Sequence, residues 1–253
     1  VTFATDTVTF CPMQGAPCVR DLNGVRRAST IADLQQINRL IQMSPGFHMG
    51  SGFSCEPTDI AVPWRHLHIM HTNLVDLDLA TNGLTTGKDR AEDCMEMARI
   101  VHGREFVEKN AVLWGHVSGN SPLVWDQTML EGLRVYAEAG QMVLVSPFVL
   151  GAANTPADVV ATVAQLNAEA VAAIAYAQLV RPGTRVIYGQ YTVSVSMRSG
   201  APMSGMPEVS LMNGIIGQLA RRYGLPWRTT ASQSSAKSFD AQSGYESATA
   251  YMA

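Results

Sequence analysis

The chain has few charged and few aromatic residues. Charged residues make up 15% and aromatic residues 7% of its 253 positions, and the formal net charge is −3. A chain without a basic excess has no electrostatic reason to bind nucleic acid or an anionic membrane. Hydrophobic residues reach 47%. This composition is typical of a protein with a large core and excludes a mainly disordered chain.

Cysteine is also scarce, and the four cysteines form no C-x-x-C pair. No basic-then-apolar segment opens the chain. We therefore expect reduced, mostly buried thiols and a cytoplasmic protein. The longest apolar stretch, 159–180, includes Asn167 and Glu169. These polar residues make it a poor membrane span and predict a packed helix.

Nucleotide-binding motifs are missing. No G-x-G-x-x-G follows an expected strand, and the glycines at 200 and 205 lack the Lys-Ser/Thr of a phosphate-binding loop. These absences favour a barrel over a doubly wound nucleotide-binding sheet.

Expected strands and helices alternate along most of the chain, which predicts βαβ units, a parallel sheet and right-handed crossovers. A barrel and an open sheet both fit this order. The expected strands are 1–10, 74–79, 111–117, 142–145, 185–188 and 225–228. The expected helices are 30–43, 59–72, 86–103, 126–139, 155–180 and 207–223, followed by a last helix capped by Ser238.

Several helix ends are visible in the sequence. Thr30 with Asp33 resembles a capping box. Thr155 can cap a helix with Pro156 at its first position, where proline costs no hydrogen bond. Gly224 follows the helix that begins at Pro207, as expected for a glycine C-cap.

Polar and aromatic residues follow several expected strands. In a barrel, such residues gather at the carboxyl ends of the strands, where active sites lie. An aromatic face there would suit a methylated ammonium group. Turn formation, solvated charges and core packing are the alternative explanations. The residues are His116, Phe148, Gln190, Tyr191, Arg198, Glu208, Asp240 and Tyr245.

One histidine group suggests a different chemistry. His66, His68 and His71 form H-x-H-x-x-H. On a strand the first two would share a face and could hold a metal ion, whereas Pro63 just before them favours a helix. The alternative function is therefore a metal-dependent barrel hydrolase that uses these three residues.

Several ordered segments of the chain resemble the trimethylamine methyltransferase (MttB-type) superfamily. The match is strongest from about residue 121 onward, and the earlier APCVRDLNGVRRASTIADL is consistent with it. The matching segments are SPLVWDQTMLEGLRVYAEAGQ (121–141), GAANTPADVVATVAQLNAEAVA (151–172), QLVRPGTRVIYG (178–189), SVSMRSGAPMSGMPE (194–208) and LARRYGLPWRTTASQSSAKSFDAQSGYE (219–246).

The resemblance implies an α/β fold, a (β/α)8 TIM-type barrel. It also implies transfer of a methyl group from a methylated amine to the Co(I) of a separate corrinoid protein. The archaeal trimethylamine enzymes carry pyrrolysine, which this sequence lacks, and relatives without it include enzymes for quaternary amines such as glycine betaine. The expected substrate is therefore trimethylamine or a betaine, and no cofactor is expected to bind tightly. The cobalamin-type corrinoid comes with the partner protein.

Family members are longer than this chain. We therefore expect residues 1–253 to be one barrel domain of a longer protein, with 1–30 as an N-terminal extension and the last barrel strands missing. A homo-oligomer is compatible with this expectation, as is a non-catalytic barrel that only binds an amine.

The resemblance and the residue pattern together assign roles within the expected pocket. The catalytic candidates are Glu208, Tyr245 and His116. The substrate-binding candidates are Gln190, Arg198, Phe148, Tyr191 and Asp240, with Arg198 placed to hold a substrate carboxylate and no metal ligand among them.

Overall fold

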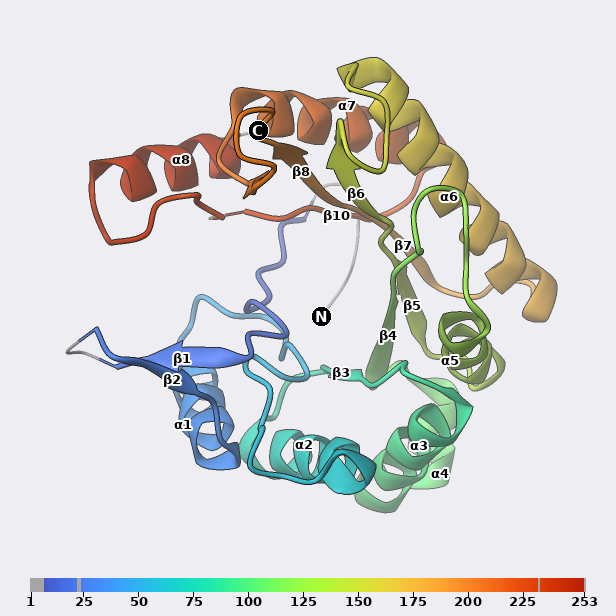
Figure 1. Cartoon of the computed structure of the whole chain (residues 1–253). Helices are drawn as coiled ribbons and strands as arrows, with labels where there is room; N and C mark the ends of the chain where they lie inside the picture. Colours follow the sequence, from blue (N-terminus) through green and yellow to red (C-terminus); the bar gives the residue numbers. More distant parts are fainter. Residues whose placement is uncertain (1–6, 22–23, 232, 253) are drawn as a thin grey trace. The chain divides into compact units, whose positions relative to one another are not determined.

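The computed structural model describes residues 7–21, 24–231 and 233–252. It divides into two compact units, one made of residues 1–116 and 131–143 and the other of residues 117–130 and 144–253. Figure 1 shows their helices and strands in the colours of the sequence.

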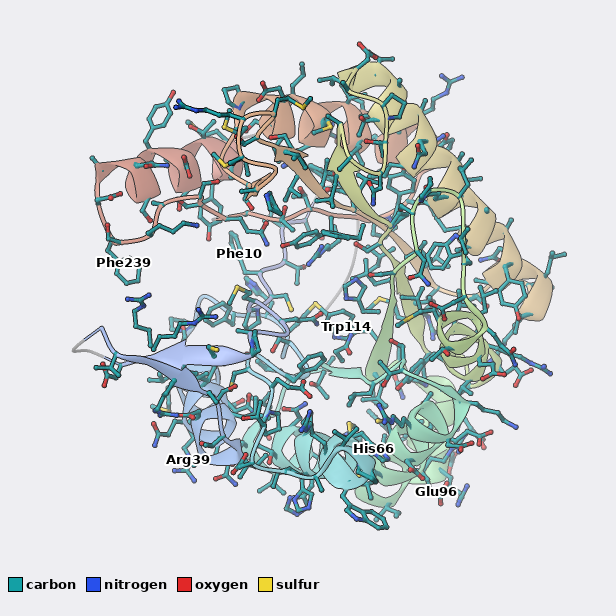
Figure 2. The ribbon with its side chains drawn as sticks, in the orientation of Figure 1. Phe10, Arg39, His66, Glu96, Trp114 and Phe239 are labelled. Atoms are coloured by element: carbon teal, nitrogen blue, oxygen red, sulfur yellow. The ribbon has the colours of Figure 1, made fainter. Side chains whose placement is uncertain are left out.

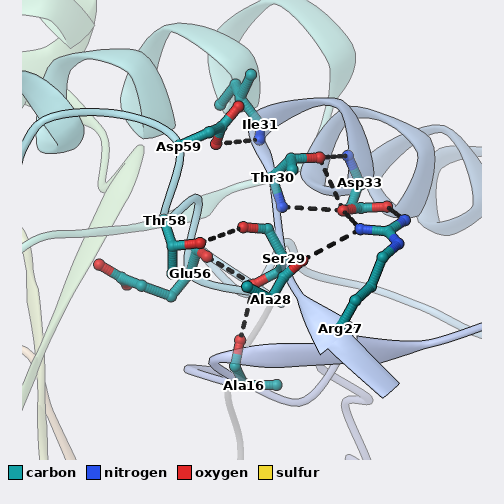
Figure 3. Close-up of polar contacts among 10 residues, drawn as sticks. All are labelled: Ala16, Arg27, Ala28, Ser29, Thr30, Ile31, Asp33, Glu56, Thr58 and Asp59. Atoms are coloured by element: carbon teal, nitrogen blue, oxygen red, sulfur yellow. Dashed lines mark hydrogen bonds and ion pairs between the residues drawn. The ribbon is translucent and has the colours of Figure 1, made fainter. Parts of the chain in front are cut away.

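The first unit begins with a small hairpin that is tied to the start of a helix. Strands β1 (Cys18–Arg20) and β2 (Arg26–Ala28) are antiparallel and precede α1 (Ile31–Met43). The predicted capping box is confirmed, because Thr30 and Asp33 exchange side-chain and backbone hydrogen bonds. Arg27 donates to both oxygens of Asp33 at 2.6 Å, as Figure 3 shows. The Arg27 guanidinium and the Thr30 donors hold the pKa of Asp33 well below its usual range.

The rest of the first unit consists mainly of helices with two parallel strands between them. They are α2 (Val62–Asp76), β3 (Thr81–Gly83), α3 (Lys88–His102), α4 (Arg104–Lys109) and β4 (Leu113–Val117), with part of α5 (Gln127–Glu138). Strands β3 and β4 pair in parallel, with Asn82 opposite Trp114 and Gly83 opposite Gly115.

Tyr136 of α5 covers one face of the β3–β4 pair. A Cβ placed on Gly83 would lie 2.2 Å from the Tyr136 hydroxyl, and one on Gly115 would lie 2.4 Å from its ring. Both positions therefore need glycine for the tyrosine to pack so closely. Successive residues of a strand point to opposite faces. The side chains of Asn82 and Trp114 thus belong to the face that Tyr136 does not cover.

The second unit contains two successive strand pairs in which one strand runs almost directly into the next. β5 (Met142–Val145), whose last two residues belong to this unit, is followed by β6 (Phe148–Gly151), and β7 (Val186–Gly189) is followed by β8 (Tyr191–Val195). β7 pairs in parallel with β10 (Trp227–Arg228). β6 pairs in parallel with β8, and β8 pairs antiparallel with β9 (Pro202–Met203). A three-stranded sheet thus follows the carboxyl ends of β5 and β7.

Three helices complete the second unit: α6 (Val159–Val180), α7 (Pro207–Tyr223) and α8 (Ala241–Met252). α6 packs against α7, β6 and β7. By length and composition α6 could cross a membrane, a test that the core helices of soluble proteins also pass. α7 begins at Pro207 and ends at Gly224, whose φ of 65° is left-handed, as predicted.

The predicted α/β class with a parallel sheet is confirmed, and so are the predicted elements that became α1, α3, β4, α5, β5, β7 and α7. Closure into a barrel and the single-domain organisation stay predictions. Of the predicted first strand, residues 1–6 lie outside the described part, and residues 7–10 are not in a strand.

Other predictions about local structure were also wrong. The strand expected at 74–79 is occupied by the end of α2 and a bend, because the helical pattern continues to Asp76. The helix expected from Pro156 begins at Val159 and is capped by Asp158, which accepts a hydrogen bond from the backbone N–H of Ala161. The loops expected after 145 and 189 contain β6, β8 and β9.

Thiol burial follows the expectation for two of the four cysteines. All four are free thiols, with Cys55 and Cys94 buried and Cys11 exposed. Burial raises the pKa of both Cys55 and Cys94 to about 11. These two thiols are therefore unreactive in the folded chain.

Candidate active site

The second unit brings two buried polar residues together just beyond β5 and β7. Ser146 follows β5 and Gln190 follows β7, and both are 0% exposed. Gly189 makes this approach possible, since a Cβ there would lie 2.8 Å from the Val145 carbonyl oxygen and 3.1 Å from the Ser146 Cβ. The carboxyl ends of the two strands are thus in direct contact.

Gln190 is held in one orientation by its neighbours. Its Nε2 donates to Asn213 Oδ1 of α7 at 2.6 Å and to Thr229 Oγ1 at 2.8 Å. Its backbone carbonyl accepts from Arg228 at 2.8 Å. Because the amide nitrogen donates to two acceptors, Oε1 is the polar atom of the side chain that stays available to a ligand.

Three buried oxygens in this region lack a hydrogen-bond partner among the residues that the structure describes. They are Gln190 Oε1, Ser146 Oγ and Thr192 Oγ1. A buried polar atom without a partner costs about 1–3 kcal/mol. Such atoms therefore suit a ligand or an ordered water. We name Ser146, Gln190 and Thr192 the oxygen cluster.

An aromatic pair lies next to the oxygen cluster. Phe148 and Tyr191 are register partners at the start of β6 and β8, with ring centroids 5.0 Å apart at 45°. Phe148 is 38% exposed. The hydroxyl of Tyr191 accepts from Gln233 at 3.3 Å. Aromatic faces and uncharged oxygens together are the groups that bind a methylated ammonium, which offers only polarised C–H groups.

A cavity of about 380 Å³ lies among β6, β8, β9 and the first turns of α6 and α7. Methionines form much of its wall, namely Met197, Met203, Met206 and Met212. Glu208, in the first turn of α7, brings the cavity a carboxylate, which the positive end of that helix favours. Methionine side chains adapt to the shape of a bound partner. This cavity could therefore hold an apolar group beside a positive charge.

The sequence was compared with known proteins. It matches the family described as Trimethylamine methyltransferase (MTTB) over residues 1–253. The chain belongs to this family.

Relatives within the MTTB family act on different amines, according to their names. The chain is 37% identical over 254 residues to a glycine betaine methyltransferase from Desulfitobacterium hafniense, covering 100% of the chain and 53% of that protein. It is 33% identical over 120 residues to the trimethylamine methyltransferase MttB of Methanosarcina thermophila, covering 47% and 24%. It is 30% identical over 161 residues to a proline betaine:corrinoid methyltransferase of Eubacterium limosum, covering 64% and 33%.

The whole chain aligns with the glycine betaine methyltransferase, but it spans only about half the length of that protein. Among solved structures, Streptococcus suis SuiB aligns with a TM-score of 0.43 and 13% identity, over 87% of this chain and 49% of that one. A likeness this weak carries no conclusion about the function of an MTTB family member.

Of the predicted site residues, the structure gathers Gln190, Phe148 and Tyr191 around the carboxyl ends of β5 and β7. Glu208 lines the methionine cavity, and Arg198 lies in the exposed turn between β8 and β9. The catalytic role expected for Glu208 and the substrate-binding roles expected for the other four residues stay predictions.

The two predicted residues near the end of the chain belong to α8. Asp240 caps this helix by accepting from the backbone N–H of Ser243 at 3.0 Å, and this bond, together with the Ser238 hydroxyl, lowers its pKa. The prediction that Ser238 caps this helix was therefore wrong. The Ser238 hydroxyl bonds to the Asp240 carboxylate, and Asp240 is the cap. Tyr245 is 75% exposed.

His116 belongs to the first unit, where it is half-buried on β4. Its Nδ1 lies 3.1 Å from Gln14 Oε1, and Gln14 Nε2 donates to the Ser51 carbonyl. Because Gln14 offers an oxygen to the ring, His116 Nδ1 carries the proton, and in the neutral ring Nε2 is the acceptor.

The metal-site hypothesis finds no support in the described residues. His66, His68 and His71 all lie on α2, as the helix alternative predicted, and Figure 2 marks His66 there. His66 Nε2 is 2.8 Å from Asp93 Oδ2. Residues 7–21, 24–231 and 233–252 contain no group of three His, Cys, Asp or Glu side chains that could hold a metal ion.

Sequence reasoning missed two glutamates that shape the second unit. Glu169 is 2% exposed, and its carboxylate accepts from the Ser121 hydroxyl at 2.5 Å and from the backbone N–H of Leu123 at 2.8 Å. It thereby fixes the segment that follows β4. The signal was present, because a lone glutamate in an otherwise apolar helix must find buried partners.

The second missed glutamate is Glu246 of α8. Its carboxylate accepts from the Ser234 hydroxyl and the backbone N–H of Ser235, both at 2.7 Å, and these donors, with Gln242, lower its pKa. A Cβ on Gly205 would overlap this carboxylate at 2.1 Å. Position 205 therefore needs glycine, which sequence reasoning considered only as part of a phosphate-binding motif.

Proposed function

We propose that the protein containing this chain transfers a methyl group from a quaternary amine, a betaine rather than trimethylamine, to the Co(I) of a corrinoid protein. The observation that carries the proposal is family membership over residues 1–253, together with 37% identity along the whole chain to a relative named glycine betaine methyltransferase. We also propose that the complete protein is a β/α barrel, because parallel strands alternate with helices here.

The chemistry of a quaternary amine supports this choice of substrate. The N–CH₃ bond breaks, the methyl group goes to the attacking cobalt, and the nitrogen keeps the electron pair and leaves as a neutral tertiary amine. No proton has to be supplied to the leaving group. The standard amino acids of the oxygen cluster are therefore sufficient, provided that they bind and orient the ammonium.

The oxygen cluster and the aromatic pair would provide this binding. Gln190 Oε1, Ser146 Oγ and Thr192 Oγ1 are acceptors withdrawn from solvent, and Phe148 and Tyr191 offer ring faces. In a site that excludes water, these groups favour a methylated cation and leave its methyl groups without strong hydrogen bonds. The corrinoid belongs to the partner protein and supplies the nucleophilic cobalt. We assign no residue of this chain to hold it.

A methyl-transfer assay tests the proposal. The full-length protein would be mixed with a reduced corrinoid protein and with glycine betaine, proline betaine or trimethylamine in turn, and cobalt methylation would be followed by absorbance. We expect transfer from at least one betaine and little from trimethylamine. Transfer from none of the three would refute the proposed reaction, and transfer from trimethylamine alone would refute the proposed substrate class.

A further inference from the structure

The face of the β3–β4 pair that Tyr136 does not cover carries two side chains with nitrogen donors. Asn82 and Trp114 are register partners on adjacent parallel strands, so their side chains share one face. Figure 2 shows Trp114 on the opposite side of the strand pair from α2 and α3. The other face is covered by Tyr136, which packs on Gly83 and Gly115. The pair therefore forms a polar spot within the first unit.

Both donors are buried and unsatisfied. Asn82 is 3% and Trp114 is 4% exposed, and neither Asn82 Nδ2 nor Trp114 Nε1 has a hydrogen-bond partner in the described part of the chain. The indole nitrogen can only donate, so no change of tautomer or rotation of an amide removes its need for an acceptor. Two unpaired donors on register partners of adjacent strands suit a ligand with two acceptor oxygens.

The backbone and side chains around the two donors are held firmly. Gly52 approaches so closely that a Cβ on it would lie 2.6 Å from the Asn82 Cβ, and its φ is 90°. The neighbouring Ser51 carbonyl anchors Gln14, which in turn holds His116. The rings of His116 and Trp114 are 6.5 Å apart. Asn82 and Trp114 are therefore preorganised rather than mobile.

We propose that Asn82 Nδ2 and Trp114 Nε1 bind a carboxylate, each donating one hydrogen bond to it. A carboxylate has two oxygens on one carbon and matches two donors on adjacent strands better than a water molecule, which would also have to place its own two protons. The carboxylate could be the anionic end of a betaine or a separate small carboxylate. Both share the chemistry that the donors recognise. The inference does not depend on the proposed methyl transfer.

Binding can be measured without any reaction. The protein would be titrated with acetate, glycine betaine and choline, which are a carboxylate alone, a carboxylate with a quaternary ammonium, and the ammonium alone. Heat of binding and the ¹H–¹⁵N resonance of the Trp114 indole would be recorded. We expect acetate, betaine or both to move that resonance downfield, and choline to leave it unchanged.

The competition between ligands identifies the source of the carboxylate. If betaine displaces acetate, the anionic end of the betaine occupies the donors. If acetate binds and betaine does not displace it, the donors serve a separate carboxylate. Either result supports the proposal. No shift with acetate or betaine, or an equal shift with choline, would overturn it.

Two variants and a matched control connect the binding to the donors. Trp114→Phe removes one N–H, and Asn82→Asp keeps the shape of the side chain and replaces the donor by an acceptor. We expect at least about tenfold weaker carboxylate binding for each. Trp64→Phe changes a tryptophan that is 62% exposed on α2 and should bind as the unchanged protein does.

Two variant outcomes would contradict the proposal. Unchanged carboxylate affinity in a folded Trp114→Phe protein would mean that the indole is not a ligand. Loss of binding in Trp64→Phe as well would show that the measurement reports something other than this site. A failure of the methyl-transfer assay would leave these results unaffected, because no corrinoid protein takes part in them.

Discussion

The two candidate sites differ in the chemistry of their unsatisfied polar groups. At the carboxyl ends of β5 and β7 in the second unit these groups are the oxygens of Ser146, Gln190 and Thr192, whereas the β3–β4 face of the first unit carries the N–H groups of Asn82 and Trp114. An aromatic pair accompanies the oxygens, and a histidine and a glutamine accompany the donors. Oxygens with aromatic faces suit a cation, and paired N–H groups suit an anion. Each of these two sites therefore has the chemistry for one kind of charge.

The largest expected effect is a loss of catalytic efficiency when the oxygen cluster is changed. Gln190→Met keeps the length of the side chain but removes Oε1 and leaves Asn213 and Thr229 without their donor. We expect kcat/KM for a betaine to fall about 100-fold, equivalent to about 2.7 kcal/mol. The methyl-transfer assay measures it, with Gln36→Met on the exposed side of α1 as control. Equal activity in both variants would remove Gln190 from the site.

The close approach of β5 and β7 gives a stability prediction. Gly189→Ala would place a Cβ 2.8 Å from a backbone oxygen, whereas a Cβ at Gly214 of α7 meets nothing within 4 Å. We expect Gly189→Ala to lower the free energy of unfolding by about 1–3 kcal/mol. Gly214→Ala should raise it by about 0.5–1 kcal/mol. Urea unfolding measures both, and similar values would mean that the contact at Gly189 is looser than described.

A pair of isosteric threonine changes tests whether the oxygen cluster is truly unsatisfied. Thr184 Oγ1 donates to the carbonyls of Arg181 at 2.6 Å and Ala177 at 3.2 Å, and Thr192 Oγ1 has no partner among the described residues. Thr184→Val should cost about 1–2 kcal/mol, and Thr192→Val should be near neutral or stabilising. Thermal unfolding compares them. A clear loss of stability in Thr192→Val would mean that this hydroxyl has a partner, such as a buried water.

The smallest expected effect is on the pH dependence of the free energy of unfolding. It involves Asp33, a fully hydrogen-bonded carboxylate in the first unit. Its pKa is lowered from 3.8 in the folded chain, chiefly by Arg27, so the stabilisation is present above pH 3.8 and is lost as the pH falls below it. Arg27 is 50% exposed, which limits the effect to about 0.5–1 kcal/mol. Urea unfolding of the unchanged protein and of Asp33→Asn should differ at pH 7, and the difference should shrink progressively as the pH is lowered from 4 towards 2. A difference that stays constant between pH 4 and pH 2 would contradict the assigned cause.

The elements that could be predicted from the sequence are those whose signals are local. The capping box at Thr30 and the start and stop of α7 at Pro207 and Gly224 each depend on residues within one turn, and each is confirmed. All four residues of Met142–Val145 are buried, and such a continuous apolar run is recognisable in the sequence as a strand even before its neighbouring strands are identified.

The strands that escaped prediction depend on partners distant in the sequence. β6 pairs with β8 more than forty residues later, and β9 is only two residues long. Small and turn-forming residues around 151–156 concealed β6, although the β-branched residues of Tyr191–Val195 were a usable signal for β8. Asp158 took the capping role expected of Thr155 because the Thr155 hydroxyl bonds instead to Thr162 and the Leu150 carbonyl.

The candidate site was predictable to the extent that it follows strand ends. Gln190, Tyr191 and Phe148 were found because they come just after apolar runs. Trp114 was missed as a site residue because it lies inside an expected strand, where an aromatic side chain looks like ordinary packing. Asn82 was missed because it belongs to β3, a three-residue strand that the sequence did not predict. Only their register and the absence of partners among the described residues distinguish them.

The composition of α6 has a consequence for the chain while it is being made. On the ribosome, residues 159–180 emerge before β7 and α7, which later cover them. Until then, a 22-residue apolar helix is open to chaperones and to membrane-insertion machinery. A single carboxylate near its middle, Glu169, opposes insertion by about 3 kcal/mol. Replacing it by leucine should therefore lower the yield of folded protein through mistargeting or aggregation of the nascent chain, in addition to any loss of stability in the finished fold.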